Sequence, residues 1–311
     1  MRIPSAEELA RAALLSVSES TTLAGLAESH GMRLGASRFV AGQTLDECVE
    51  VLRGLNEQGL SANTTILGEA VEDKAQAEAV TASYEVVIRR LVDEKLDANV
   101  SLKLTHLGLE LDEELAYANV ERLVALAEGL GSFLRIDMEH SSAVDSTLRT
   151  YRRLREAGHD RVGTVLQSYL YRTARDLADL MPLAPNLRIV KGAYLEPPER
   201  AFPEKSDVDR NFVELVETGL LGGAYIAVAT HDERIIARVR EFAQERGIER
   251  DRFEFQMLYG VRSGLQREVA AAGYKVLVAT PYGPDWYPYL MRRLAERPAN
   301  VGFLLRNLVR P

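Results

Sequence analysis

The segment "NVSLKLTHLGLELDEELAYANVERLVALAEGLGSFLRIDME" (99–139) carries the pattern that decides the fold. The runs at its two ends, 99–105 and 133–139, are short and rich in Val, Leu, Ile and Phe, as strands buried on both faces are. Between them, 112–130 has apolar residues at helical spacing and acidic residues in its first turn. A strand, a helix and a second strand predict a parallel pair joined by a crossover helix.

The same alternation continues in both directions along the chain. Further strands are expected at 63–68, 161–167, 187–193, 224–231, 253–259 and 275–282. Further helices are expected at 73–96, 143–157, 170–181, 208–221, 232–246, 261–272 and 286–296. About eight such units predict an α/β protein whose sheet closes into a (βα)8 barrel, a TIM-like fold.

The chain before the first strand has a different pattern. Residues 1–60 are expected to form an N-terminal helical segment packed on the barrel, and 61–311 to form the barrel itself. The clearest helix of the first segment is "TLDECVEVLRGLNEQG" (44–59), where Gly59 supplies the stop.

Composition excludes several classes of function. The 311 residues have a formal net charge of -8, which argues against nucleic acid as a partner. Cys48 is the only cysteine, so no intrachain disulfide forms, and it is expected to be buried. The five histidines lack the spacing of metal ligands, so we expect no metal. No apolar run is long enough to span a membrane, and the first residues lack a signal-peptide core.

Polar side chains gather where the predicted strands end, which is where barrels of this class place their sites. In chain order they are Glu69, Lys103, Asp137, Glu139, Gln167, Ser168, Tyr169, Arg188, Lys191, Thr230, His231, Gln256 and Tyr259. A charged group on a barrel strand is costly unless it is paired. Lys103, Asp137, Arg188 and Lys191 therefore serve either a site or interior ion pairs. Strand alternation alone leaves open whether Arg188 points into the barrel.

The stretch "YLMRRLAERP" (289–298) places two guanidinium groups side by side. Tyr289, Arg292, Arg293 and Glu296 follow the spacing of one helical face. If this last helix lies over the barrel mouth, the two arginines could hold one carboxylate. The alternative is a solvated basic end of a terminal helix. The strand ends at 191–194 and 229–233 could hold phosphates. No GxGxxG motif follows the first strand, which excludes a Rossmann cofactor domain.

Seven motifs in register on these strands resemble the proline dehydrogenase family, most closely its small, single-function bacterial form. They are "SLKLT", "RIDME", "LQSYL", "RIVKGAY", "ATH", "EFQMLYG" and "WYPYLMRRLAERPAN". The resemblance implies a distorted barrel that holds FAD noncovalently. It implies oxidation of L-proline to Δ1-pyrroline-5-carboxylate, the first step of proline catabolism to glutamate, by hydride transfer to flavin N5. Electrons would pass to a membrane quinone, which implies a cytoplasmic protein associated peripherally with the inner face of the membrane; the oligomeric state stays open.

The resemblance also implies roles for individual residues. Lys103, Arg292 and Arg293 would bind the proline carboxylate, Tyr289 would pack on the substrate ring, and Glu69 would pair with Arg292 as a gate. Asp137 would lie at the junction of flavin and substrate, and Arg188 would donate toward flavin N5. The residues holding the flavin would be Met138, Gln167, Arg188, Lys191, Gly192, Ala193, Thr230 and His231.

One position departs from the family pattern. Many members carry an aromatic residue where this chain has Ala279, in "VATPYG" (278–283). Ala279 could leave room for the hydroxyl of hydroxyproline, or a neighbouring side chain could fill the gap.

Two other functions fit the residues less well. Lys103 or Lys191 could serve as the Schiff-base nucleophile of an aldolase-like barrel. A barrel that binds an anion without catalysis is the third alternative.

Overall fold

The structure is a computed structural model that describes residues 36–68, 70–287, 289 and 290. Glu69, Arg292 and Arg293 lie outside the described residues, as does most of the expected helix 286–296, of which Trp286, Tyr287 and the pair 289–290 are helical. The expectation that this helix lies over the barrel mouth therefore concerns residues that the structure does not describe.

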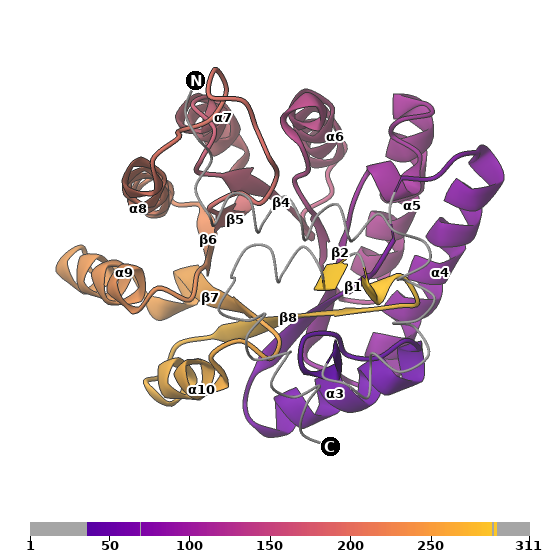
Figure 1. Ribbon diagram of the computed structural model, residues 1–311, viewed down its shortest axis with the longest axis horizontal. Helices are drawn as coiled ribbons and strands as arrows, with labels where there is room; N and C mark the ends of the chain where they lie inside the picture. Colours follow the sequence, from indigo (N-terminus) through magenta and orange to yellow (C-terminus); the bar gives the residue numbers. More distant parts are fainter. Residues whose placement is uncertain (1–35, 69, 288, 291–311) are drawn as a thin grey trace, which may run out of the picture.

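A closed parallel barrel forms the centre of the molecule (Figure 1), which confirms the predicted (βα)8 class. Its strands follow chain order around the barrel, and β8 pairs with β1 to close it. They are β1 (Ser61–Ile66), β2 (Ala98–Leu102), β3 (Leu134–Ile136), β4 (Val162–Gln167), β5 (Asn186–Val190), β6 (Tyr225–Ala229), β7 (Phe253–Leu258) and β8 (Val276–Tyr282).

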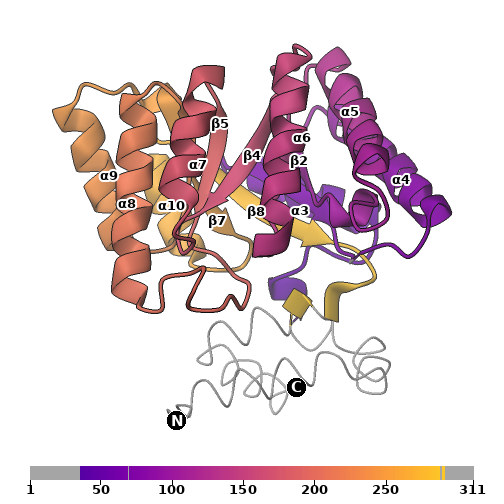
Figure 2. The same ribbon diagram turned by 90° about the horizontal axis from the view of Figure 1, so that it is seen from above.

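Helices surround the barrel on its outside (Figures 1 and 2). They are α3 (Leu45–Glu57), α4 (Lys74–Asp93), α5 (Glu113–Gly129), α6 (Val144–Glu156), α7 (Thr173–Leu180), α8 (Lys205–Leu221), α9 (Glu233–Glu245) and α10 (Ser263–Ala271). Short 3-10 turns are η1 (Ala36–Arg38), η2 (Thr105–Leu107), η3 (Ser141–Ala143), η4 (Met181–Leu183) and η5 (Arg250–Arg252). Among the described residues, no helix combines the length and the apolar character needed to cross a bilayer.

Helix α3 precedes the first strand yet packs beside both β1 and β8 (Figure 1). Thr44 and Glu47 form a capping box that fixes where α3 begins, because each side chain bonds the backbone of the other. Its inner face buries Leu52 and Cys48, and the Cys48 thiol lies 3.3 Å from the hydroxyl of Thr64 on β1. Cys48 is fully buried, which confirms the prediction for this residue, and burial raises the pKa of its thiol to about 11.

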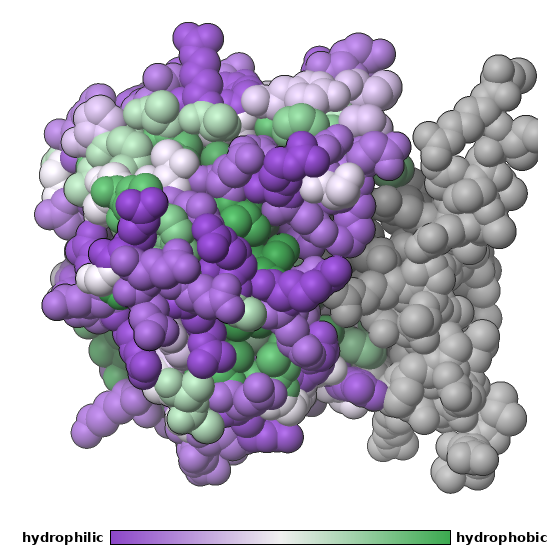
Figure 3. Space-filling view, turned by 90° about the vertical axis from the view of Figure 1, so that its left-hand side faces the viewer, coloured by the Kyte–Doolittle hydropathy of each residue, from purple (hydrophilic) through white to green (hydrophobic). Residues whose placement is uncertain are grey.

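Ion pairs link neighbouring outer helices. Arg122 of α5 binds two carboxylates of α4, those of Glu78 and Glu85, and Arg153 of α6 binds Glu114 of α5. Each exposed pair of this kind stabilises a protein by roughly 0–1 kcal/mol, so the helices are held mainly by their apolar faces. The side of the molecule that carries α8, α9 and α10 is largely hydrophilic at its surface, with apolar residues in scattered patches (Figure 3).

A buried cation, Arg135, occupies part of the barrel interior. Arg135 on β3 is only 2% exposed, and it donates to the carbonyl of Thr164 and to the side chain of Asn186. Gly163 on β4 leaves the space for this guanidinium: a Cβ there would lie 2.9 Å from Nη1 of Arg135 and 2.8 Å from the carbonyl oxygen of Asn186. A glycine in a central strand is explained here by close packing.

We predict that Gly163→Ala lowers the free energy of unfolding by about 1–3 kcal/mol, because the added methyl group overpacks the barrel interior. Denaturant unfolding measures the change. Gly54→Ala in α3 is the matched control, since a Cβ there meets nothing within 4 Å; it should raise stability by about 0.4–1 kcal/mol. Equal stability of Gly163→Ala and the wild type would contradict the packing argument.

Candidate active site

Arg188 of β5 points into the barrel, which settles the direction that strand alternation left open. Its side chain is 10% exposed, and its partners come from β1, β2 and β7 and from the residue after β3. Nε donates to Gln256 on β7 at 2.5 Å. Nη2 donates to Asn63 on β1 at 3.1 Å and to Ser101 on β2 at 3.2 Å. Nη1 donates to Asp137 at 2.6 Å.

These four hydrogen bonds leave one donor free. A guanidinium has five N–H groups, of which Nε carries one and each Nη carries two. Described residues accept one N–H from Nε, two from Nη2 and one from Nη1. Arg188 therefore keeps a single N–H, on the nitrogen that also binds Asp137, for a further electron-rich atom.

Asp137 follows β3 directly, and its backbone N–H donates to the carbonyl of Leu102 on β2 at 2.8 Å. That bond extends the pairing of the two strands by one residue and fixes the carboxylate at the strand ends. The side chain of Asp137 is 25% exposed, more than that of Arg188. The ion pair thus has a buried cation and a carboxylate that reaches toward the opening of the barrel.

Lys103 follows β2 and is partly buried, yet no described carboxylate pairs with it. The nearby acid, Glu139, is 4% exposed, and its two oxygens accept from the backbone and the hydroxyl of Thr105. Burial, and then the charge of Lys103, lower the pKa of His106 to about 4, so this imidazole is neutral at neutral pH. Of Lys103, Glu139 and His106, only Lys103 carries a positive charge at neutral pH. Its ammonium group remains available for an anion.

The ends of β4, β5 and β6 lie side by side and carry the residues assigned to the flavin other than Met138. Gln167 donates to the carbonyl of Glu139 at 2.8 Å, while its buried Oε1 has no hydrogen-bond partner among the described residues. Oxygen Oγ1 of Thr230 accepts from the backbone of Asp232 at 3.1 Å. Nε2 of His231 accepts from the backbone of Leu258 at 2.9 Å, which places a proton of the neutral ring on Nδ1.

Lys191 does not point into the barrel as Arg188 does; it binds Asp209 of α8 at 2.5 Å. Lys205 binds the other oxygen of the same carboxylate. Two lysines and one aspartate leave this corner with one net positive charge, which suits a phosphate group. Both neighbours of Asp209 stabilise its ionised form and lower its pKa, although burial opposes them.

Gly192 lies two residues after β5 and has φ = +115°, a conformation that strongly favours glycine. A Cβ at this position would lie 2.3 Å from the ring of Tyr169. Glycine at 192 therefore lets the chain pass directly against the ring of Tyr169. Among the described residues, the unpartnered oxygen of Gln167, the net positive charge around Asp209 and one uncommitted N–H of Arg188 together fit a large, polar, anionic cofactor such as FAD.

The remaining assigned residues occupy different parts of the mouth. Ala279 on β8 is the register neighbour of Asn63 on β1 and Leu258 on β7, so it lies near the partners of Arg188 and stays partly exposed. Met138 follows Asp137 and is 7% exposed. Tyr289 is partly buried and is the residue before the last described one, Leu290.

Three anchors of Arg188 were not among the assigned site residues: Asn63, Ser101 and Gln256. Gln256 was noted only as a polar residue at a strand end. No usable signal for Asn63 or Ser101 was present in the sequence, because β1 (SANTTI) and β2 (ANVSL) carry other polar residues beside them. Their partner could not be read from the sequence, since the hydrogen bonds join positions 125 and 87 residues apart.

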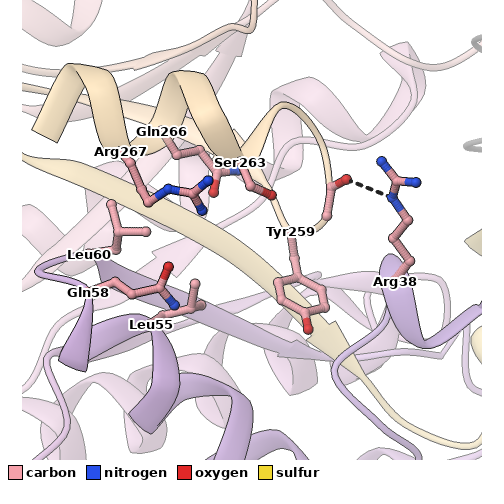
Figure 4. A pocket seen from close by; sticks show the side chains of 9 residues that line it. Arg38, Leu55, Gln58, Leu60, Tyr259, Ser263, Gln266 and Arg267 are labelled. Atoms are coloured by element: carbon pink, nitrogen blue, oxygen red, sulfur yellow. Dashed lines mark hydrogen bonds between the residues drawn. The ribbon is translucent and has the colours of Figure 1, made fainter.

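A cavity of about 340 Å³ lies away from this site, between α3 and α10 on the flank of the barrel (Figure 4). Leu55 and Leu60 line one side, and Tyr259, Gln266 and Arg267 line the other. None of the residues assigned to substrate or flavin is among its lining residues.

Known proteins resemble this chain over nearly its whole length. A family model described as proline dehydrogenase matches residues 48–306. Proline dehydrogenase 1 of Bacillus subtilis is 42% identical over 300 residues, covering 96% of this chain and 99% of that protein. The proline dehydrogenase of Deinococcus radiodurans is 42% identical over 308 residues, covering 98% and 99%.

A solved structure supports the same relationship. The crystal structure of proline utilization A (PutA) from Bdellovibrio bacteriovorus inactivated by N-propargylglycine superposes with a TM-score of 0.81 and 25% identity. The match covers 94% of this chain but only 35% of that longer chain. With sequence and fold in agreement, this chain belongs to the proline dehydrogenase family of oxidoreductases.

Proposed function

We propose that this protein binds FAD noncovalently and oxidises L-proline to Δ1-pyrroline-5-carboxylate, with a membrane quinone as the final electron acceptor. Family membership makes the protein an oxidoreductase of proline catabolism. The proposal for FAD and proline is supported mainly by the hydrogen bonding of Arg188. Its buried guanidinium has four described partners and one remaining N–H beside Asp137.

FAD, when bound, supplies the acceptor for the hydride that leaves the ring carbon next to the proline nitrogen. We assign Arg188 the role of donor toward the N5 region of the flavin, where negative charge develops. Asp137 holds Nη1 of Arg188 and would lie at the junction of flavin and substrate. Met138, Gln167, Lys191, Gly192, Ala193, Thr230 and His231 are proposed to hold the rest of the cofactor.

Binding of the substrate is assigned to Lys103, whose ammonium group no described carboxylate neutralises. We propose that Lys103 shares the proline carboxylate with Arg292 and Arg293, that Tyr289 packs on the ring, and that Glu69 closes over the site by pairing with Arg292. A fixed carboxylate orients the ring carbon for transfer. Cations around the substrate also favour the neutral amine, whose lone pair must form the carbon–nitrogen double bond.

The division of the chain and its location follow from this function. Residues 1–60 are proposed as the N-terminal segment and 61–311 as the FAD-binding barrel; α3 and β1 meet at this boundary. A quinone acceptor resides in the bilayer, so we propose peripheral contact with the inner face of the membrane.

The purified protein should be yellow, and anaerobic L-proline should remove its visible flavin absorbance, because the substrate reduces the cofactor. A spectrum recorded before and after addition is the measurement. A colourless protein would contradict the FAD assignment, and a flavin unaffected by proline would contradict the substrate. Trapping of a lysine adduct by borohydride would instead support the Schiff-base alternative.

Lys103→Met should lower kcat/KM for proline by about 2 kcal/mol or more, roughly 30-fold, mainly through KM, because the carboxylate loses a desolvated partner. Arg292→Ala and Arg293→Ala should act in the same direction. Lys74→Met, at an exposed position on α4, is the matched control and should keep wild-type kinetics. Normal KM values in all three site variants would refute the carboxylate clamp.

Ala279→Tyr should lower the ratio of kcat/KM for 4-hydroxyproline to kcat/KM for proline by about tenfold, because the ring fills the space assigned to the hydroxyl. Ala279→Ser adds little volume and is the control. The ratio is measured for each purified variant, and a ratio that stays constant across the three proteins would remove Ala279 as a determinant of specificity.

A further inference from the structure

Besides Arg188 and its partners, the barrel strands carry a second group of buried polar side chains. Its centre is Glu254 of β7, which is 3% exposed. Oxygen Oε2 of Glu254 accepts from the hydroxyl of Tyr225 at 2.9 Å and lies 3.1 Å from the ammonium group of Lys275. Burial acts to raise the pKa of Glu254, but Lys275 and Arg135 together hold it below its ordinary value. Glu254 is therefore an ionised carboxylate and accepts hydrogen bonds only.

Gln256 connects this carboxylate to the proposed active site. It lies two residues after Glu254 on the same face of β7 and is 3% exposed. Its Nε2 donates to Oε1 of Glu254 at 2.5 Å, and its Oε1 accepts from Nε of Arg188 at 2.5 Å. A carboxylate at one end and a guanidinium at the other allow only one orientation of the amide, because Glu254 cannot donate and Arg188 cannot accept.

The position of this bond decides where the free donor of Arg188 points. Nε, Nη1 and Nη2 lie in one plane. Gln256 holds Nε from β7, while Asn63 and Ser101 hold Nη2 from β1 and β2. Two edges of a rigid planar group, one held from β7 and the other from β1 and β2, determine the direction of the third nitrogen, Nη1. Without Gln256, Nε–H would be buried and unpaired. Because this is unfavourable, the guanidinium would rotate toward another acceptor.

We propose that Gln256 and Glu254 are positioning residues of this enzyme: Glu254 fixes the amide of Gln256, which fixes the plane of Arg188 and aims its remaining N–H at the flavin. The proposal rests on the function proposed above and adds to it two residues that touch neither substrate nor cofactor. The orientation of Arg188 is thereby set by two side chains that are each 3% exposed.

The test compares Gln256→Met with the wild-type holoenzyme. Methionine has nearly the volume of glutamine but offers no acceptor to Arg188 and no donor to Glu254. We expect kcat to fall about tenfold or more, KM for proline to change less than twofold, and the midpoint potential of bound FAD to become more negative as the cationic donor turns away. Slow solvent exchange of the Arg188 Nε–H, measured by NMR without substrate, should be lost.

Gln266→Met is the matched control. Gln266 lies on α10, is 2% exposed and donates to two backbone carbonyls, so the same substitution removes buried hydrogen bonds without touching Arg188. It should lower stability but leave kcat, the potential and the exchange rate at wild-type values. An equal shift of the potential in both variants would overturn the proposal, because it would indicate general loosening of the barrel.

Glu254→Gln is a second variant that tests the proposal if Gln256→Met folds poorly. A glutamine at 254 keeps a hydrogen bond to Gln256 but no longer enforces its orientation, so kcat and the potential should change in the same direction by a smaller amount. Wild-type kcat and potential in this variant would overturn the role of Glu254. A wild-type protein that proline does not reduce would refute the proposed function instead, and the exchange of the Arg188 Nε–H would still test the positioning.

Discussion

Burial of one guanidinium in the middle of a parallel barrel is the constraint on which the site depends. A cation with 10% of its side chain exposed destabilises a fold unless its donors are satisfied. Arg188 meets this demand with partners from β1, β2, β7 and the residue after β3. Strands that are remote in the chain are thereby tied to one planar group, and closure of the sheet is what brings them within reach.

The two sides of the mouth differ in charge and in what they can hold. On the β2 and β3 side, a carboxylate is committed to Arg188, while the ammonium group of Lys103 is uncommitted among the described residues. On the β4 to β6 side, the polar atoms are backbone groups, an amide and a lysine shared with α8. A small anion suits the first side and an extended polar cofactor suits the second, with Arg188 between them.

Much of the fold follows from local pattern. All eight expected strands overlap observed ones, and the expected helices from 44–59 to 261–272 overlap α3 to α10. The differences lie at strand ends. The run 187–193 stops being a strand at Val190, before Gly192 adopts positive φ, and in 133–139 only Leu134–Ile136 form a strand.

The sequence by itself determined the alternation of strands and helices, the closure class, and which strand ends carry polar side chains, because hydrophobic periodicity and turn chemistry are local properties. Only the tertiary structure decided that Arg188 points inward, that Asn63, Ser101 and Gln256 hold it, and that Lys191 turns to Asp209. Those contacts depend on the register of strands around a closed barrel, which places side chains opposite one another across its interior. No local sequence pattern encodes the distance between side chains on different strands, since that distance is fixed only when β8 pairs with β1.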